Sequence, residues 1–256
     1  MQILLTNDDG VHAPGLAALH DALIHLGQVC VVAPKTEQSG VGLSVTYLHP
    51  LMVDDAFRND QRWASAVHGS PADCVKLGML QFCKPRPDLV VSGINSGANV
   101  GINVLYSGTV AGAIEGAFFG VPSIAVSHDV DSPPDYHRAS RIAVALIEEL
   151  WSRGLERGEL WNINVPANRP GWPRGVRVAS LSVRRHADLM ERRCDPRGRP
   201  YYWSGLDPLD KNQMDPGTDA QELADGYVTM TPLDFDMTRH DVVDTTGSDA
   251  FHLPHA

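Results

Sequence analysis

Lysine and arginine are absent from two long stretches of this 256-residue chain, 1–34 and 88–137. Over the whole chain, 21 basic residues stand against 31 acidic ones, which gives a formal net charge of −10. A chain of this kind lacks the basic surface that duplex nucleic acid or an anionic membrane requires, and we expect neither as a partner. A small anionic ligand is not excluded, because metal ions and backbone amides also bind anions.

Cysteine is sparse as well, with four residues and no pair in C-x-x-C spacing. This argues against a zinc site or a disulfide framework, and Cys30, in the apolar run 29–33, is expected to be a buried thiol. The longest uncharged run, 89–114, carries three Asn and five Gly and is too polar for a membrane span. The first residues show no leader pattern, so we expect a cytoplasmic protein.

Strand-like apolar runs alternate with helical patterns over about two thirds of the chain, which predicts βαβ units. Strands are predicted at 3–6, 28–33, 88–92, 122–127, 160–165 and 227–231, with a looser β excursion at 43–53. Helices are predicted at 16–26, 70–82, 108–120 and 136–153. The fold class is therefore α/β, with a Rossmann-like three-layer αβα core and a mostly parallel sheet. No G-x-G-x-x-G follows the first predicted strand, which disfavours a nicotinamide dehydrogenase.

The texture of the sequence changes after about residue 182. Residues 183–220 are rich in Arg, Asp, Pro and Gly and have few apolar runs. We therefore divide the chain into a catalytic core, 1–182, and a C-terminal extension, 183–256. The extension is interpreted as an oligomerisation arm that packs on a partner subunit, not as an independent domain.

Asp8 and Asp9 stand directly after the first predicted strand, where ligands bind in open α/β sheets. On a strand their side chains would point to opposite faces, but in the turn that Gly10 allows they can converge. Two carboxylates this close repel each other unless a cation or a proton lies between them. The alternative is an Asx-type turn that caps the following helix, and local sequence alone does not decide between the two.

The loop at 92–109 is unusually rich in Gly and Asn, which lets the backbone approach a ligand closely. Asn95 offers an amide oxygen near the end of a strand. Ser107, Gly108 and Thr109 open the next helix, where free N–H groups and the positive end of the dipole favour an anion. The glycines that follow, spaced along that helix, are interpreted as close packing.

The oxygen donors Asp8, Asp9 and Asn95, to which Ser39 can be added, include no His or Cys. Hard oxygen ligands of this kind favour Mg²⁺, Mn²⁺ or Ca²⁺ over zinc. Two carboxylates on a divalent ion leave the site about neutral, so that it can accept a phosphate with help from the helix amides. The lack of Lys and Arg around these loops fits recognition by a metal and backbone amides.

Several motifs together resemble the SurE family of stationary-phase survival proteins, and the likeness extends over nearly the whole chain. The motifs are Leu-Leu-Thr-Asn-Asp-Asp-Gly, Ala-Pro-x4-Ser-Gly, Ser-Gly-Ile-Asn-x-Gly-Ala-Asn-x-Gly, Leu-Tyr-Ser-Gly-Thr-Val, His-Gly-Ser-Pro-Ala-Asp-Cys-Val, Asp-Pro-Arg-Gly-Arg-Pro-Tyr-Tyr-Trp and Gly-Tyr-Val-x-x-Thr-Pro-Leu. The resemblance implies a Rossmann-like core with C-terminal arms exchanged between subunits of a homodimer or homotetramer. It implies hydrolysis of nucleoside 5′- and 3′-monophosphates, and of short polyphosphate in some members.

Carried over by motif, the resemblance implies one divalent metal ion per subunit, Mg²⁺ or Mn²⁺. The implied ligands are Asp8, Asp9, Ser39 and Asn95. Asp8 and Asp9 would also be the catalytic residues, and Asn95 with 107–109 would bind the phosphate. A covalent aspartyl-phosphate is ranked lower, because the two Asp are adjacent and not spaced as Asp-x-Asp. A nucleotide-binding or assembly protein without turnover is the alternative from another class.

Overall fold

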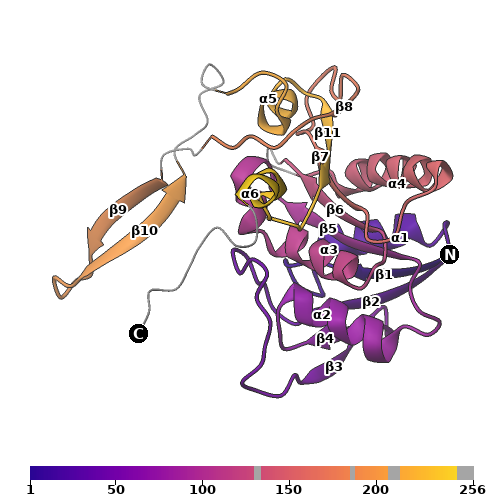
Figure 1. Ribbon diagram of the computed structural model, residues 1–256. Coiled ribbons are helices and arrows are strands. Elements are labelled where there is room, and N and C mark those ends of the chain that lie inside the picture. Colours follow the sequence, from indigo (N-terminus) through magenta and orange to yellow (C-terminus); the bar gives the residue numbers. More distant parts are fainter. Residues whose placement is uncertain (130–133, 185–187, 207–213, 247–256) are drawn as a thin grey trace, which may run out of the picture.

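The computed structural model of the chain describes residues 1–129, 134–184, 188–206 and 214–246. The strands of its main sheet are β1 (Gln2–Thr6), β2 (Gln28–Pro34), β3 (Val53–Arg58), β4 (Gln61–Val67), β5 (Leu89–Ser96), β6 (Ser123–His128), β7 (Leu160–Val165), β8 (Val176–Val178) and β11 (Val228–Leu233). They form a nine-stranded sheet in the order β3-β4-β2-β1-β5-β6-β7-β11-β8 (Figure 1). From β4 to β7 all neighbours run parallel. Only the edges depart from this, because β3 is antiparallel to β4 and β11 is antiparallel to β7.

Helices cover both faces of this sheet. They are α1 (Pro14–Leu23), α2 (Pro71–Leu77), α3 (Gly108–Phe118), α4 (Tyr136–Arg153), α5 (Asp219–Ala224) and α6 (His240–Thr246), with a π-helical turn η1 (Gly78–Phe82) and a 3-10 turn η2 (Gly101–Leu105). Helix α1 packs beside α4, and α2 packs beside α3 on the other side of the sheet (labelled in Figure 1). The predicted α/β class and three-layer core are therefore confirmed. No helix within the described residues is long and apolar enough to cross a membrane.

The helix predicted at 70–82 begins where the sequence places it. Ser70 Oγ accepts the Asp73 N–H at 3.1 Å, and the Asp73 carboxylate accepts the Ser70 N–H at 3.0 Å, which makes a complete capping box. The α-helix ends at Leu77 and continues as the π-helical turn η1 to Phe82. The chain therefore follows the predicted span with a change of helical pitch in its second half.

The β excursion predicted at 43–53 is wrong except for its last residue, where β3 begins. The segment is instead fixed on the start of α2: the Thr46 N–H donates to Asp73 at 2.9 Å, and Ser70 Oγ donates to the Ser44 carbonyl at 2.6 Å. These side-chain contacts satisfy backbone groups that a strand would have paired with a neighbour. The strands that do form, β3 and β4, make an antiparallel hairpin just after it.

The expectation of free cysteines is also wrong at one pair, because a disulfide joins Cys30 to Cys83. Cys30 lies on β2 and Cys83 directly follows η1, which brings their Cα atoms to 6.0 Å, a normal disulfide span. The two residues are 53 positions apart in the sequence and share no recognisable spacing, so only the fold brings them together. Cys74 and Cys194 are free.

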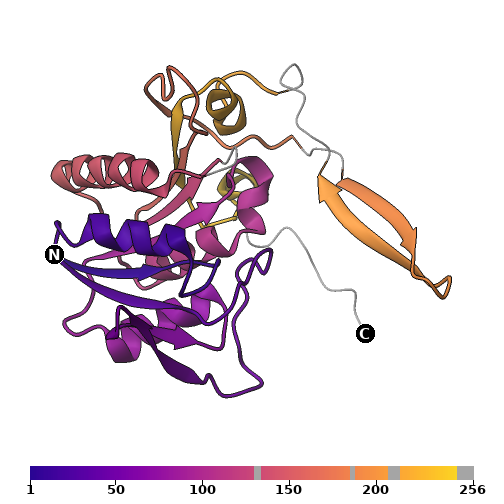
Figure 2. The same ribbon diagram turned by 180° about the vertical axis from the view of Figure 1, so that it is seen from behind.

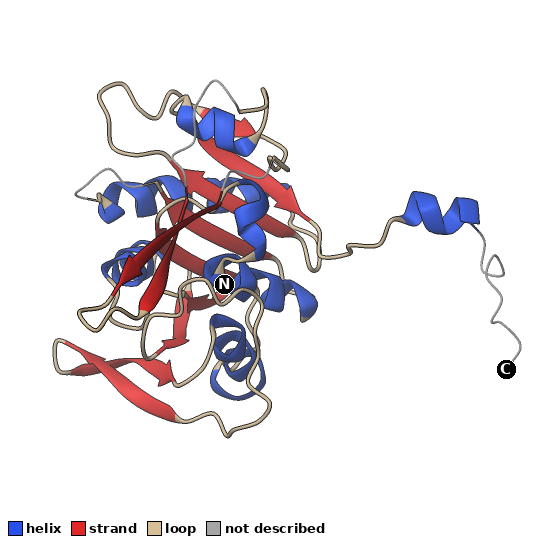
Figure 3. Ribbon diagram, turned by 90° about the vertical axis from the view of Figure 1, so that its left-hand side faces the viewer, coloured by secondary structure: helices blue, strands red, loops and turns tan. Residues whose placement is uncertain are grey.

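The part of the chain after residue 182 contributes to the core sheet, to a separate hairpin and to a helix that lies away from the core. Strand β11 joins the core sheet between β7 and β8, whereas β9 (Asp188–Cys194) and β10 (Pro200–Leu206) form a separate antiparallel hairpin that projects from the core (Figures 1 and 2). Helix α6 also stands away from the core, on the far end of an extended segment (Figure 3). The division of the chain at residue 182 stays a prediction. We call the hairpin of β9 and β10 the arm.

Candidate metal and phosphate site

The candidate site lies where the central parallel strands end. Strands β1 and β5 are neighbours, with Thr6 opposite Ser92 in the register. Because parallel neighbours end at the same edge of a sheet, the turn after β1, with Asp8 and Asp9, lies beside the end of β5, with Asn95. The fold therefore brings together loops that are about ninety residues apart in the sequence.

The turn after β1 is built around Gly10, which has a φ of +101°, a conformation that side chains other than glycine rarely adopt. The Asn7 side-chain amide donates to the Gly10 carbonyl at 3.0 Å and closes the turn. Helix α1 starts later, and its N-cap residue, Ala13, receives no side-chain cap. The alternative that the Asp pair caps this helix is therefore not supported, because neither carboxylate is used for that purpose.

Asp8 is almost completely buried, with 4% of its surface exposed. Its Oδ1 accepts a short hydrogen bond from the Thr109 hydroxyl at the start of α3. A Cβ at position 108 would lie 2.8 Å from the Asp8 Cβ, so glycine is required there for this close approach. Burial raises the pKa of Asp8, and hydrogen bonds from the Thr109 hydroxyl and from backbone N–H groups oppose this in part.

Asp9 is partly exposed, and its Oδ2 accepts the backbone N–H of Ser96, the residue after Asn95, at 3.2 Å. Burial and the neighbouring negative charge of Asp8 raise the pKa of Asp9 to about 6. In the part of the chain that the structure describes, neither Asp8 nor Asp9 forms an ion pair with a basic side chain. The pair is therefore a site of uncompensated negative charge.

The loop after β2 packs on the same turn. The Gln38 N–H donates to the Asp8 carbonyl at 2.7 Å, and the exposed Ser39 hydroxyl donates to Glu37 at 2.7 Å. Glu37 was not among the predicted residues, yet its charge contributes to the raised pKa of both Asp8 and Asp9. Ser39 is thus brought next to the Asp pair, with its hydroxyl turned towards a third carboxylate.

Asn95 and the start of α3 complete the neighbourhood. The Asn95 side-chain N–H donates to the Gly97 carbonyl at 2.8 Å, which leaves its amide oxygen as the acceptor that can face a ligand. Ser107 is the N-cap of α3, where its hydroxyl accepts the Val110 N–H at 3.2 Å. Thr109 faces Asp8 with its hydroxyl, so the predicted phosphate-binding residue is also a partner of a predicted metal ligand.

The glycines along α3 are packing residues, as the sequence indicates. A Cβ at Gly112 would meet the Ser92 hydroxyl at 3.0 Å, and one at Gly116 would meet the Ser123 hydroxyl at 2.4 Å. Both neighbours belong to strands of the sheet beneath the helix. Small residues on this face let α3 lie close enough to the sheet for Gly108 and Thr109 to reach Asp8.

Buried polar residues of β7 and α5, which the sequence analysis missed, hold the Gly-rich loop in place. The Asn99 N–H donates to Asn164 Oδ1 at 2.8 Å, and the Asn99 carbonyl accepts from Asn162 at 2.8 Å and from Asn164 at 3.0 Å. Asp219, on α5, accepts the Gly101 N–H at 2.7 Å. Asn162 and Asn164 had a signal in the sequence, the alternation Asn-Ile-Asn in a strand that is otherwise apolar. Such a pattern indicates specific partners, because a buried amide needs a hydrogen bond. Asp219 had no comparable local signal.

The residues of this site fit a divalent metal ion that prefers oxygen ligands. The side-chain oxygen Oδ1 of Asn7 is buried in the same turn and has no hydrogen-bond partner. Within the described residues there is no group of three or more His, Cys, Asp and Glu side chains that could hold a metal, so an ion at the Asp pair would need amide or hydroxyl oxygens as further ligands. Two carboxylates, completed by amide and hydroxyl oxygens and by water, are a typical donor set for Mg²⁺ or Mn²⁺.

Lys35 is the basic residue closest in sequence to Ser39, and it is occupied elsewhere. Its Nζ forms an ion pair with Asp54 of β3 at 2.5 Å, and His68 Nε2 lies 3.0 Å from the same carboxylate. All of these side chains are about half exposed. Lys35 therefore does not pair with the Asp8 and Asp9 carboxylates, and no other described basic side chain forms an ion pair with them.

Comparison with known proteins identifies the family. The family model described as "Survival protein SurE" matches residues 3–188. The chain is 52% identical over 244 residues to the 5′-nucleotidase SurE of Rhodopirellula baltica, covering 95% of this chain and 96% of that one. It is 44% identical to the 5′-nucleotidase SurE of Syntrophobacter fumaroxidans, covering 96% and 98% of the two chains. The crystal structure of the SurE protein from Aquifex aeolicus matches with a TM-score of 0.83 at 36% identity, covering 96% of this chain and 98% of that one. This chain belongs to the SurE family.

Proposed function

We propose that this protein is a divalent-metal-dependent phosphatase that hydrolyses nucleoside 5′- and 3′-monophosphates to nucleoside and phosphate, with short polyphosphate as a further substrate. The observation that carries the proposal is the adjacent Asp8–Asp9 pair, with Asp8 buried and Asp9 partly exposed. The pair lies beside the start of α3 and has no basic partner among the described residues. The relatives most similar to the chain include two named 5′-nucleotidase SurE, which supports a nucleotide substrate.

In this proposal Asp8, Asp9, Ser39 and Asn95 hold one Mg²⁺ or Mn²⁺ ion per subunit. When bound, the ion would polarise a phosphoryl oxygen and lower the pKa of a water molecule that attacks the phosphorus. The oxygen donors present and the lack of a basic partner for the Asp pair support this choice of ion.

The chain's own residues do the positioning. The Thr109 hydroxyl orients Asp8 Oδ1, and the Ser96 N–H orients Asp9 Oδ2, so the two carboxylates are fixed from the start of α3 and from the end of β5. Backbone N–H groups of 107–109, at the positive end of the α3 dipole, stabilise the charge that develops on the phosphoryl oxygens. Asn95 adds an amide group at the edge of β5.

The test is phosphate release from 5′-AMP, 3′-AMP and tripolyphosphate by the purified protein with Mn²⁺ or Mg²⁺. Matched reactions contain excess chelator, the Asp9→Asn variant, or the Asp21→Asn variant as a control at an exposed carboxylate outside the site. We expect release that requires the metal, fails in Asp9→Asn and survives in Asp21→Asn. Activity that neither chelator nor Asp9→Asn reduces would overturn the metal mechanism.

The same experiment distinguishes an enzyme from a protein that binds nucleotides without turnover. A binding protein would show metal-dependent nucleotide affinity by calorimetry and no phosphate release above the buffer blank. Because no described residue brings a basic side chain into the site, we also expect phosphate itself to bind poorly until the divalent ion is added. Tight phosphate binding in chelator would contradict that expectation.

We also propose that the protein forms a homodimer or homotetramer through the arm. The arm carries exposed apolar side chains that no described residue covers: Leu189, Met190, Tyr202 and Trp203 are each more than half exposed. Such side chains on a projecting hairpin favour contact with another subunit. Light scattering of the intact chain, compared with a Tyr202→Ser, Trp203→Ser double variant, tests this. A cytoplasmic location stays a prediction, which cell fractionation would test.

A further inference from the structure

Asp219 is a fully buried carboxylate at the first position of α5, with 0% of its surface exposed. It accepts three backbone N–H groups: Gly101 at 2.7 Å, Ser182 at 2.9 Å and Ala220 at 2.8 Å. Only the last donor belongs to its own helix. Because a buried carboxylate requires donors of this kind, Asp219 holds two other segments of the chain against the start of α5.

The first of these segments is the Gly-rich loop of the candidate site. Gly101 has a φ of +59°, and a Cβ there would lie 2.7 Å from the Ser182 carbonyl oxygen, so the loop rests directly on the segment at 182. Gly101 begins η2, which runs to Leu105 and leads to the N-cap of α3 at Ser107. Asp219 therefore fixes the middle of the stretch that connects Asn95 with the start of α3.

The second segment is the base of the arm. Ser182 is where the chain leaves the core towards β9, and Asp219 is where it has returned from β10. The Asp219 N–H donates to the Ser180 carbonyl at 2.8 Å, and Arg184 lies 3.8 Å from Asp215 in an ion pair that spans the outgoing and returning chain. The chain segments that precede β9 and follow β10 thus meet at Asp219, the residue that holds the Gly-rich loop.

We propose that Asp219 is a positioning residue that couples the base of the arm to the Gly-rich loop and so sets the order of the phosphate side of the site. The kinetic part of this inference rests on the proposed function; the structural part does not. With Asp219 in place, the loop is held before substrate arrives. Without it, the loop must become ordered when substrate binds. The free-energy cost of that ordering weakens substrate binding, whereas the bound state itself stays nearly unchanged.

The kinetic test compares Asp219→Asn with the wild-type protein under metal-saturated conditions. Asn keeps the size of the side chain but places an NH₂ group against an N–H donor. We expect KM for 5′-AMP to rise about tenfold or more, in line with the loss of a hydrogen bond to a charged group, while kcat stays within about twofold. The matched control is Asp225→Asn at the other end of α5, where, within the described ranges, the carboxylate accepts a hydrogen bond from the Gln221 side chain alone, at 2.8 Å. There we expect both constants unchanged.

The second readout is amide hydrogen exchange followed by NMR, which needs neither substrate nor activity. In the wild-type protein, the amide protons of Gly101 and Ser182 should exchange at similar, slow rates, because one opening event exposes both. In Asp219→Asn both should exchange at least tenfold faster, while amides in the strands of the central sheet keep their rates. Asp225→Asn should change neither.

Each result of the two experiments either supports or overturns the proposed role of Asp219. Similar exchange rates at Gly101 and Ser182, together with a rise in KM, support the proposal. Unlike rates in the wild-type protein, or a folded Asp219→Asn with unchanged KM and exchange, overturn it, as does a loss confined to kcat. If Asp219→Asn does not fold, the wild-type comparison decides. If the wild-type protein releases no phosphate, the proposed function fails and the exchange data still test the coupling.

Discussion

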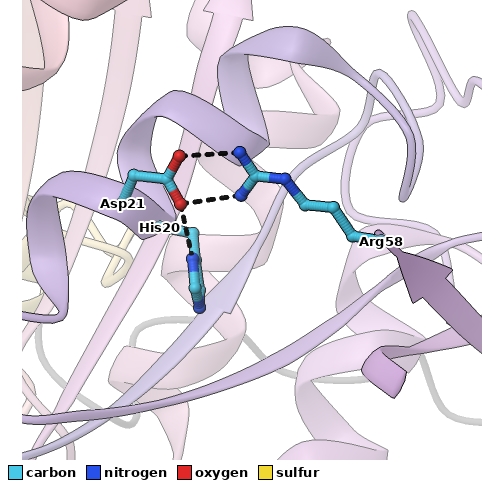
Figure 4. Close-up of polar contacts among 3 residues, drawn as sticks. All are labelled: His20, Asp21 and Arg58. Atoms are coloured by element: carbon cyan, nitrogen blue, oxygen red, sulfur yellow. Dashed lines mark hydrogen bonds and ion pairs between the residues drawn. The ribbon is translucent and has the colours of Figure 1, made fainter. Parts of the chain in front are cut away.

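Two aspartates of the N-terminal segment, Asp9 and Asp21, lie in opposite electrostatic surroundings. Asp21, on α1, accepts two hydrogen bonds of 2.7 Å from the Arg58 guanidinium at the end of β3, with His20 beside it (Figure 4). The Arg58 hydrogen bonds lower the pKa of Asp21 to about 2. Burial and the charge of Asp8 raise the pKa of Asp9 to about 6. Asp21 has a cation from its own chain, whereas Asp9 has none among the residues that the structure describes.

This difference shows what the lack of Lys and Arg in residues 1–34 means for the two aspartates. Stretch 1–34 contains both aspartates and no Lys or Arg, so any basic partner must come from another segment. The fold supplies Arg58 to Asp21 and, among the described residues, supplies no basic ion-pair partner to Asp8 or Asp9. A buried, unpaired negative charge is unfavourable, and it persists where an external cation stabilises it. The contrast is the one we expect if Asp21 is a structural carboxylate and Asp9 is a ligand of the proposed metal ion.

The largest expected effect is on activity, when the charge of Asp9 is removed from the site. Asp9→Asn should lower kcat/KM for 5′-AMP by roughly 10³-fold or more, because one charged ligand of the proposed metal is lost. Asp21→Asn should leave kcat/KM within about twofold. Steady-state kinetics over a range of Mn²⁺ concentrations checks both. Equal losses in the two variants would show that the contrast in charge has no bearing on activity.

A smaller effect concerns stability, and it follows from the same uncompensated charge. Mn²⁺ at about 100 times its dissociation constant should stabilise the wild-type protein by about 2.7 kcal/mol. For a chain of this size that corresponds to an increase in Tm of roughly 5–10 °C. Asp8→Asn should lose most of this increase, and Asp21→Asn should keep it. Thermal melts with and without chelator give the answer, and a metal-induced increase in Asp8→Asn equal to that of the wild type would count against Asp8 as a ligand.

The layers of the fold and the loops of the site could be predicted from the sequence because their signals are local. Leu16, Leu19 and Leu23 repeat at helical spacing, and all three are completely buried in α1. The Asp pair and the Gly-rich loop follow apolar runs short enough to be buried strands, and ligands in α/β sheets bind beyond strand ends. These patterns need no knowledge of which strands are neighbours.

The features that could not be predicted depend on contacts between distant segments. The Cys30–Cys83 disulfide joins residues 53 positions apart. The segment at 43–53 is predicted to be a strand, but two of its backbone groups form hydrogen bonds with Asp73 of α2 and with Ser70, the N-cap of that helix. Asp219 contacts Gly101 across 118 positions, so its role is visible only once both segments are placed.

The pH dependence of stability should have opposite signs at the two aspartates in metal-free protein. The pKa of Asp9 is raised on folding, so its contribution is present below about pH 4 and is lost as the pH rises through about 6. The pKa of Asp21 is lowered, so its contribution is present above about pH 4 and is lost as the pH falls through about 2. Both groups are partly exposed, so each effect should be about 1 kcal/mol or less.

Denaturant unfolding in chelator, from pH 3 to pH 8, measures these contributions by difference. The free energy of unfolding of Asp9→Asn relative to the wild type should increase as the pH rises through about 6. The relative stability of Asp21→Asn should decrease as the pH rises from 3 to about 4, above which Asp21 of the wild type is fully ionised in both states. Parallel curves for wild type and Asp9→Asn would mean that the folded pKa of Asp9 is close to its ordinary value.

The smallest effect on stability is expected when the Asp21–Arg58 ion pair is broken. Asp21 and Arg58 have side chains that are 43% and 38% exposed, so their ion pair is screened by solvent. Arg58→Ala should therefore lower the free energy of unfolding by less than about 1 kcal/mol and leave kcat/KM unchanged. Arg58→Lys is the matched control, because it keeps the charge and loses the two-pronged geometry. A loss well above 1 kcal/mol in Arg58→Ala alone would mean that this guanidinium, 5.8 Å from the Trp63 ring, holds the β3–β4 hairpin by packing as well as by charge.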